Sequence, residues 1–306
     1  MARAYASTIL DAPVEAVWDL VRDFNGLPAW NAAIARSEIE DGLDSDVVGC
    51  VRRFHLPDGT LVRERLLSLN DRDYSFTYNF ETPAFPVTNY LARMRLLPVT
   101  DGEKTFAEWE ATFDEAPEDA GKYVDIVSNA VFQAGWNSLK PRVAGRAAPA
   151  GAQRWSGFPP SKAWCSTVID APVEAVWSII RDFAGMGGWH DDITRMQMLD
   201  GARSDKVSGT RDFLFGAGHL NEKLLHLDDT ERSYSYFITK SELPWMQYVS
   251  GPRLWPVTDG NRTFGTWFGD WVASPRDDAA LIPNTEQNVY LKALHTVARR
   301  CSRALV

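Results

Sequence analysis

Apolar residues near the N-terminus follow the spacing of a helix. One stripe recurs at positions i, i+3, i+4 and i+7 and consists of Val14, Val17, Trp18 and Val21. This spacing places the four side chains on one face of a helix. Asp11 is expected to cap that helix, with Pro13 in the first turn, where a missing N–H is tolerated. The preceding segment, Tyr5–Leu10, has the composition of a short strand.

The same stretch occurs a second time in the chain. Between Ser7 and Trp30, 15 of 24 positions match their counterparts in residues 166–189. The apolar stripe is kept in the copy as Val173, Val176, Trp177 and Ile180. The chain therefore contains one structural unit twice.

After Trp30 the helical spacing gives way to short segments that are separated by turn residues. The expected strands are Ala35–Glu40, Gly49–His55, Leu61–Leu69, Tyr74–Glu81, Val87–Leu97 and Thr105–Asp114. Helical spacing returns from Glu118 to Lys140, and Pro141 is expected to end that helix. This order predicts an antiparallel sheet of about seven strands with one long C-terminal helix.

The second half repeats this order with small insertions and deletions. It opens with the strand-like segment Trp164–Ile169 and closes with a helix expected from Asn284 to Leu305. The intervening segment is rich in proline and lacks periodicity, as a linker does. We therefore predict an α+β protein with a first domain at residues 1–141, a linker at 142–163 and a second domain at 164–306.

Composition narrows the class of protein. The net charge of −9 and the pI of about 5.1 argue against binding to nucleic acid or to an anionic membrane, because both require a basic surface. No signal peptide is recognisable, and no apolar run approaches the ~20 residues that span a bilayer. A cytoplasmic protein is expected. The three cysteines suggest neither a disulfide framework nor a thiolate metal site, and the 12 tryptophans must lie in cores, in an interface or around an apolar ligand.

Two motifs connect the chain to a known superfamily. They are the opening D-A-P-x-E-x-V-W and the terminal-helix segment V-F-Q-A-G-W-N-S-L-K. Both are similar to bacterial members of the START-like (SRPBCC) superfamily, which includes birch-pollen-allergen-like proteins and polyketide cyclase/dehydrase and lipid-transport domains. The resemblance covers both halves and implies tandem helix-grip domains, each a curved sheet wrapped around its long helix.

Four further stretches resemble the plant abscisic-acid receptors of this superfamily in order and spacing. They are Val48–Arg52, Leu56–Gly59, Arg63–Leu66 and Thr88–Tyr90. The resemblance implies a cavity for an apolar ligand under a mobile Leu-Pro loop, with a basic residue, a Glu and a Tyr facing it. By position these residues are Arg36, Glu64 and Tyr90 in the first copy and Arg195, Glu222 and Tyr248 in the second. The second copy has Phe215–Gly218 in place of the Leu-Pro loop.

Strand alternation tests part of this assignment independently. Arg93 and Arg95 share one face of their strand, so Tyr90 points with the apolar residues of the other face. The same alternation places Glu64 inside, where a carboxylate needs a partner or a raised pKa. Two interpretations stay open. Glu64 forms a structural ion pair, either with Arg36 or with an arginine of a neighbouring strand, or Glu64 and Tyr90 handle protons while Arg36 holds negative charge on a ligand.

Three further ionisable residues, Glu108, Glu110 and His190, lie near the expected cavity or on the strand beside it. Alternation exposes Glu108 and Glu110 and turns Trp109 inward, although a bulge would reverse this. His190 is followed by two aspartates near the expected cavity mouth and is interpreted as part of a solvated loop, as the general base of a second site or, least of all, as a metal ligand. No metal and no cofactor are expected, because no phosphate loop, nucleophile elbow or CxxC occurs.

The sequence thus favours a cavity that binds a bulky apolar, aromatic small molecule. The residues expected to line it are Trp30, Asn31, Leu56, Trp109, Val131, Gly135, Trp189, Trp245 and Trp267. The leading hypothesis is a cofactor-independent lyase, cyclase or dehydratase that uses Arg36, Glu64 and Tyr90 or Arg195, Glu222, Tyr248 and His190. The alternatives are a non-catalytic carrier or sensor, or a pair in which one domain serves as an interface. A homo-oligomer is compatible with the sequence.

Overall fold

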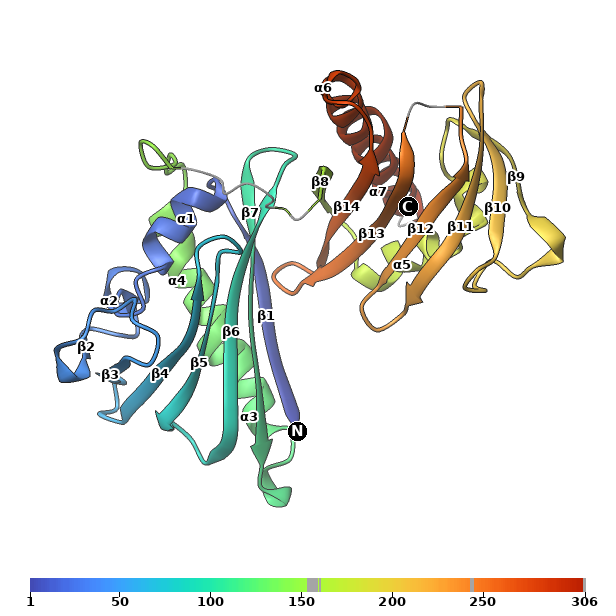
Figure 1. Ribbon diagram of the computed structural model, residues 1–306. Helices are drawn as coiled ribbons and strands as arrows, with labels where there is room; N and C mark the ends of the chain where they lie inside the picture. The colour runs from blue at the N-terminus through green and yellow to red at the C-terminus, as the bar shows by residue number, and fades with distance from the viewer. Residues whose placement is uncertain (153–158, 160, 243–244, 305–306) are drawn as a thin grey trace. The chain divides into compact units, whose positions relative to one another are not determined.

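The computed structural model describes residues 1–152, 159, 161–242 and 245–304. The chain divides into two compact units, one of residues 1–99 and 103–158 and the other of residues 100–102 and 159–306. We call them the N-terminal and the C-terminal domain (Figure 1). Residues 153–158 and 160 of the predicted linker and Leu305 of the predicted last helix lie outside the described residues.

The N-terminal domain is built on one antiparallel sheet with the order β1-β7-β6-β5-β4-β3-β2. Its strands are β1 (Ala2–Leu10), β2 (Ser37–Ile39), β3 (Val51–His55), β4 (Leu61–Asn70), β5 (Ser75–Thr82), β6 (Val87–Val99) and β7 (Lys104–Glu115). Every strand after β1 pairs with its neighbour in sequence, and β1 closes the sheet against β7. The predicted seven-stranded antiparallel sheet is confirmed.

One long helix crosses a face of this sheet (Figure 1). It is continuous through α3 (Lys122–Asp125), the π-helical segment η3 (Ile126–Gln133) and α4 (Ala134–Val143). Two short helices, α1 (Val14–Val21) and α2 (Leu27–Trp30), and two 3-10 turns, η1 (Glu40–Gly42) and η2 (Pro117–Asp119), complete the domain. Sheet and long helix together form the helix-grip arrangement.

The C-terminal domain repeats this architecture with the strand order β8-β14-β13-β12-β11-β10-β9. Its strands are β8 (Ala163–Ile169), β9 (Ile193–Met198), β10 (Thr210–Phe215), β11 (Gly218–Asp228), β12 (Ser233–Lys240), β13 (Met246–Val257) and β14 (Arg262–Val272). Its helical elements are α5 (Val173–Ile180), η4 (Gly185–Gly188), η5 (Leu199–Gly201) and the continuous long helix α6 (Pro275–Asn284), η6 (Thr285–Leu291) and α7 (Lys292–Ala304). In both domains a π-helical segment occupies the middle of the long helix.

Three predicted helix boundaries are wrong. Asp11 makes no side-chain cap, because α1 begins only at Val14 after Pro13. The first long helix passes through Pro141, which removes one hydrogen bond in the last turn, while Leu139 and Val143 stay fully buried and hold that turn in place. The second long helix begins already at Pro275, where the Ser274 hydroxyl accepts a hydrogen bond from Asp277 N at 3.2 Å.

Side chains alternate across the sheet as the pattern predicted. Between residues 90 and 96 of β6 the buried residues are Tyr90, Ala92, Met94 and Leu96, and the arginines between them point to the outer face. Glu108 also lies on the outer face but is only 5% exposed, because Arg95 and the Tyr5 hydroxyl both bind its carboxylate. The expected exposure of Glu108 is therefore wrong, although its facing is correct.

The repeated opening stretch has the same structural task in both domains. In the N-terminal domain, Asp71 accepts hydrogen bonds from Trp18 Nε1 at 2.9 Å and from Arg22 Nε at 2.6 Å. Asp229 accepts the same two bonds, at 2.9 and 2.6 Å, from Trp177 and Arg181. Each bond set joins the first helix to the turn that follows the fourth strand of its sheet, which explains why the Trp and the Arg recur together.

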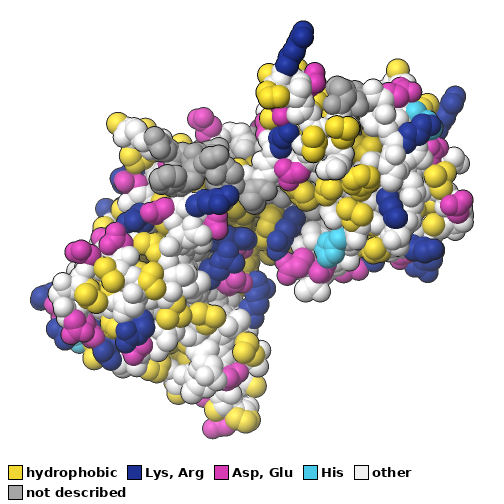
Figure 2. Space-filling view, in the orientation of Figure 1, with side chains coloured by type: hydrophobic (Ala, Val, Ile, Leu, Met, Phe, Trp, Pro, Cys, Tyr) yellow, Lys and Arg dark blue, Asp and Glu magenta, His cyan; other side chains and the backbone are white. Residues whose placement is uncertain are grey.

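Acidic and basic side chains are interspersed on the face shown in Figure 2. All three cysteines are free and buried. Within the described part of the chain, no helix is both long and apolar enough to cross a membrane.

Candidate functional site

Each domain contains a cavity between the concave sheet and the long helix. The N-terminal cavity has a volume of about 490 Å³ and the C-terminal one about 440 Å³, sizes that suit a drug-sized small molecule. The predicted residues that line them are Asn31, Leu56, Glu64, Tyr90, Trp109, Val131 and Gly135 in the first, and His190, Glu222, Trp245, Tyr248 and Trp267 in the second.

Both buried glutamates are paired with an arginine of the neighbouring strand, which is one of the structural alternatives expected for Glu64, and not with Arg36 or Arg195. Arg36 is 85% exposed at its side chain, where its nearest carboxylate is that of Glu38 at 3.7 Å. Arg195 is exposed on the outer strand β9. The predicted inward positions of Arg36 and Arg195 are wrong. Arg36 lies directly before the edge strand β2 and Arg195 lies on the edge strand β9, and both side chains are exposed to solvent.

The true partner of Glu64 is Arg52, which stands directly opposite it on the neighbouring strand β3. Arg52 Nε donates to Glu64 Oε2 at 2.7 Å, and its Nη1 donates to the carbonyl of Phe24. Arg211 and Glu222 repeat the pair in the C-terminal domain at 2.7 Å. Burial raises the pKa of Glu64 and Glu222, and the arginines oppose that rise.

A sequence signal for Arg52 existed. Arg52 and Phe54 are two residues apart on one strand and so share a face, as do Arg211 and Phe213 in the copy. An arginine that alternates with a buried aromatic residue at the same place in both repeats is a candidate for the inner face. The guanidinium of Arg52 indeed lies 3.9 Å from the centroid of the Phe24 ring.

Tyr90 lies on the inner face of β6 among carbon rings. Its ring stacks on Phe80 at 3.9 Å between centroids and on Phe113 at 5.9 Å. The neighbouring Tyr78 accepts a hydrogen bond from Trp109 Nε1 at 2.9 Å. Burial raises the pKa of Tyr90 well above its ordinary value, so its phenol stays neutral and can donate a hydrogen bond.

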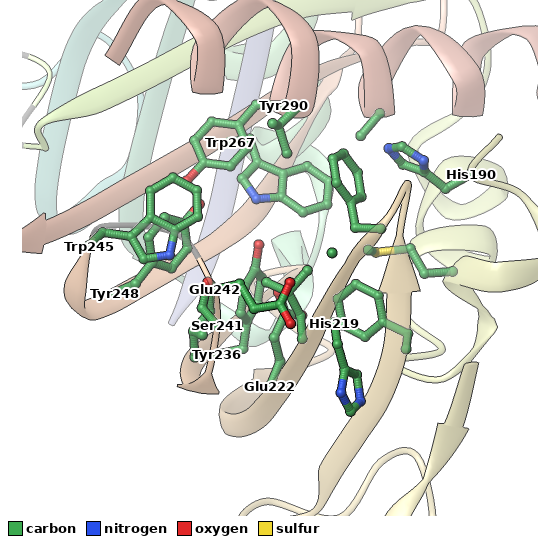
Figure 3. Close-up of a pocket in the computed structure, with 18 of the residues that line it drawn as sticks. His190, His219, Glu222, Tyr236, Ser241, Glu242, Trp245, Tyr248, Trp267 and Tyr290 are labelled. Carbon is green, nitrogen blue, oxygen red and sulfur yellow. The ribbon is translucent and has the colours of Figure 1, made fainter. Parts of the chain in front are cut away.

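The C-terminal cavity carries a cluster of hydroxyl groups (Figure 3). The hydroxyls of Tyr248 and Tyr290 are hydrogen-bonded to each other. Ser250 Oγ accepts from Trp267 Nε1 at 3.0 Å and donates to the backbone carbonyl of Phe268 at 2.6 Å. Burial raises the pKa of both tyrosines well above the ordinary value, so they too are hydrogen-bond donors. Tyr290 and Ser250 were not predicted as site residues.

His190 lines the same cavity on the side away from Trp245 and Tyr248 (Figure 3). Its Nδ1 accepts a hydrogen bond from the backbone N–H of Asp192 at 3.2 Å. Burial lowers the pKa of His190, which favours the neutral ring. A neutral ring that accepts at Nδ1 carries its hydrogen on Nε2, so His190 can offer a hydrogen bond to a ligand.

The two aspartates after His190 are engaged by the long helix. Lys292 Nζ binds Asp192 at 2.5 Å, and Arg299 binds Asp191 at 3.1 Å. Among the described residues, no group of His, Cys, Asp and Glu side chains is arranged to hold a metal ion. His219 also lines the cavity and binds Asp212 at 2.5 Å.

Two predicted ligand contacts are core residues instead. Trp30 and Trp189 are 3% and 5% exposed and do not line either cavity. Trp30 packs behind the wall, with its ring centroid 6.1 Å from that of Trp109. The short helical segments that carry or precede these tryptophans turn them toward the domain interior rather than toward the cavity mouth.

The loops over the two cavities differ in length. Residues 56–60 connect β3 to β4, and Leu56, Pro57 and Asp58 line the N-terminal cavity. Gly59 has a φ of +88°, which lets its N–H reach the Leu56 carbonyl at 2.9 Å. In the C-terminal domain the hairpin closes directly from Phe215 to Gly218, and both of these residues line the cavity.

One family model and several solved structures match this chain. A family model described as "Polyketide cyclase / dehydrase and lipid transport" matches residues 1–144 and 165–301. No curated protein matches the chain.

Solved structures match one domain or both. The protein XoxI from Bacillus cereus is 29% identical, covers 47% of this chain and 96% of its own, and has a TM-score of 0.43. The di-domain ARO/CYC BexL from the BE-7585A biosynthetic pathway is 11% identical, with 98% and 99% covered and a TM-score of 0.40. A norcoclaurine synthase point mutant from Thalictrum flavum is 13% identical, with 47% and 94% covered and a TM-score of 0.40.

Proposed function

Because the chain belongs to the polyketide cyclase/dehydrase and lipid transport family, we propose that its cavities bind a bulky apolar, aromatic small molecule and that its own side chains catalyse an acid/base reaction on it. The reaction would be of the lyase, cyclase or dehydratase type. One observation carries the proposal: each domain places tyrosine residues and a buried glutamate, which an arginine holds in place, in the wall of a mainly apolar cavity.

The surroundings of these groups suggest separate roles. Tyr90 and Tyr248 are neutral donors that can stabilise negative charge developing on a ligand oxygen. Arg52 binds Oε2 of Glu64, so Oε1 is the carboxylate oxygen that can meet a ligand. A raised pKa makes this carboxylate a stronger proton acceptor, and the arginine holds it in one orientation. An apolar cavity adds to catalysis by excluding water and restricting the shape of the substrate.

A carrier of the same class of ligand is the second candidate. It is favoured by the fact that Arg52 and Glu64 neutralise each other within the wall, as a purely structural pair does. Catalysis requires that Glu64 or Tyr90 act on the ligand, whereas transport requires only the cavity.

Native mass spectrometry of the full chain, purified from its own host, would identify a retained small molecule. Glu64→Gln, Tyr90→Phe, Glu222→Gln and Tyr248→Phe are then compared in a turnover assay and a binding assay with that molecule. If the protein is an enzyme, the two substitutions in one of the domains are expected to abolish turnover while the molecule still binds. If all four variants change only the affinity, the protein is a carrier.

The two domains can be tested separately with a matched pair of variants. Val131 and Val289 occupy equivalent positions on the two long helices, and each lines its own cavity. Val131→Trp is expected to close the N-terminal cavity and Val289→Trp the C-terminal one. The variant that abolishes turnover identifies the working domain, and loss of turnover in neither variant would contradict catalysis inside the cavities.

A further inference from the structure

The two cavities differ at one wall, where a tyrosine replaces a phenylalanine. Tyr290 stands at the position of Phe132, 158 residues earlier in the repeat. Each ring stacks on the equivalent tryptophan of its own domain: Phe132 on Trp109 at 4.7 Å and 15°, and Tyr290 on Trp267 at 5.8 Å and 15°. The two rings therefore hold the same place in the fold, and the difference between them is one hydroxyl group.

A second difference makes room for that hydroxyl. Gly269 replaces Ala111 on the strand that faces the long helix. A Cβ atom added at Gly269 would lie only 2.0 Å from the Tyr290 hydroxyl oxygen and 3.0 Å from Cζ of the same ring. The tyrosine hydroxyl thus occupies space that an alanine would fill. Tyr290 and Gly269 form a matched pair, as Phe132 and Ala111 do in the N-terminal domain.

The added hydroxyl leaves a hydrogen to donate. Tyr248 and Tyr290 together carry two hydroxyl hydrogens, and the bond between their oxygens uses one of them. Ser250 is also a hydrogen-bond partner of both tyrosines. Both tyrosines line the cavity, so a ligand oxygen that reaches the pair can compete with Ser250 for the second hydrogen. The pair is a donor toward the cavity because its tyrosines stay neutral.

Trp245 adds a second donor beside the pair. Its ring centroid lies 4.7 Å from that of Tyr248, and it lines the same cavity (Figure 3). Its Nε1 atom is buried and has no hydrogen-bond partner among the described residues. A buried donor without a partner costs free energy, which an acceptor on a ligand would recover.

The corresponding tyrosine of the N-terminal domain also has a tyrosine partner, Tyr78, whose ring centroid lies 6.3 Å from its own. The indole N–H of Trp109 in that cavity is already bound to Tyr78, so it is not free for a ligand as that of Trp245 is. Tyr90 is packed against three phenylalanine rings, Phe80, Phe85 and Phe113, at centroid distances of 3.9, 6.5 and 5.9 Å. None of these rings can donate a hydrogen bond.

We propose that the wall formed by Tyr248, Tyr290 and Trp245 is a recognition site for an acceptor oxygen, a carbonyl or phenolate, on the aromatic ligand of the C-terminal cavity. This inference rests on the proposed binding of an aromatic molecule and goes beyond it, because it names the chemical group on the ligand that the C-terminal cavity recognises.

Two probes of the same shape test the assignment. 2-Acetylnaphthalene presents a ketone oxygen, and 2-isopropenylnaphthalene carries a CH2 group in its place. Both are titrated by calorimetry into the full chain carrying Val131→Trp, so that the C-terminal cavity is measured. The ketone is expected to bind about fivefold more tightly, the ratio that corresponds to one net hydrogen bond of ~1 kcal/mol. Tyr290→Phe is expected to remove most of this preference.

The infrared band of the bound ketone gives a readout independent of affinity. Hydrogen bonding lowers the C=O stretching frequency, so the band is expected to move to higher frequency in Tyr290→Phe. Trp245→Phe removes the other hydrogen-bond donor, and it replaces Tyr290→Phe in both measurements if Tyr290→Phe fails to fold. Tyr234→Phe is the control, because Tyr234 is buried in the same domain but does not line the cavity.

Each result decides between the two proposals. Equal affinity of the two probes, or a ketone preference that survives both Tyr290→Phe and Trp245→Phe, overturns the acceptor-oxygen site and leaves aromatic binding intact. Binding of neither probe overturns the site together with the proposed function.

Discussion

Substitution of Gly269 by alanine is expected to destabilise the C-terminal domain through the Tyr290 hydroxyl. The new Cβ would lie 2.0 Å from that oxygen, well inside the separation of ~3.5 Å at which nonbonded atoms normally rest. Tyr290 is fully buried and stacked on Trp267, so its ring has little freedom to move away.

The magnitude follows from three contributions. Overpacking a well-filled core costs about 1–3 kcal/mol. Loss of the bond between Tyr248 and Tyr290 adds about 0.5–1.5 kcal/mol. Replacing glycine by alanine returns about 0.4–1 kcal/mol through the unfolded chain. The net loss is about 2 kcal/mol, which corresponds to about 4–8 °C in the melting temperature of a domain of this size.

Differential scanning calorimetry of the full chain measures the effect on the C-terminal transition. Gly265→Ala is the matched control, because it lies on the same strand and its added Cβ would meet only side-chain atoms of Leu294, Leu254 and Ile169, at 3.3–3.6 Å. Its melting temperature should change little. The double variant Gly269→Ala/Tyr290→Phe recreates the pairing of Ala111 with Phe132 and should recover most of the loss, with a coupling energy of about 1–3 kcal/mol.

Two results would refute this reasoning. If Gly269→Ala melts at the same temperature as Gly265→Ala, the close approach to Tyr290 does not constrain the domain. If Tyr290→Phe fails to rescue Gly269→Ala, some group other than the hydroxyl opposes the added methyl.

Three further predictions concern other parts of the molecule. Glu64→Leu leaves Arg52 buried without its partner and should lower the free energy of unfolding of the N-terminal domain by about 3–5 kcal/mol, as measured by chemical denaturation. The double variant Arg52→Met/Glu64→Leu should recover most of that loss. If the single and the double variant lose the same amount of stability, the ion pair does not matter. Hydrogen bonds from Arg181 and Trp177 hold the pKa of Asp229 at about 2, below its ordinary value of 3.8, so the stability that this carboxylate contributes is present above pH 3.8 and is lost as the pH falls toward 2. The unfolding curves of wild type and Asp229→Asn should therefore converge over that interval, and a constant separation would contradict the assignment. Val131→Trp and Val289→Trp should each lower the calorimetric stoichiometry of 2-acetylnaphthalene by one site, and an unchanged stoichiometry would show that the probe binds elsewhere.

Much of the fold could be predicted from the sequence because it depends on local patterns. Alternation along the strands identifies the inner faces, and it correctly turned Glu64, Tyr90 and Trp109 inward. The internal repeat predicted two helix-grip domains, and each domain has a seven-stranded sheet and a long helix. Helix ends were predicted less well, since Pro141 and Pro283 are tolerated inside helices whose last or middle turns are held by packing.

The composition of the candidate site depended on contacts between strands and helices that are distant in sequence. Alternation shows that Glu64 is inside, but only the register of β3 against β4 places Arg52 opposite it, and the resemblance to a known family pointed to Arg36 instead. The sequence likewise shows a tyrosine at 290 and a glycine at 269, in place of a phenylalanine and an alanine. Only the packing of the long helix on β14 brings the two positions together, because spatial proximity across a sheet and a helix is not encoded in any local pattern. Local periodicity thus determined which side chains turn inward, and tertiary packing decided which of them meet.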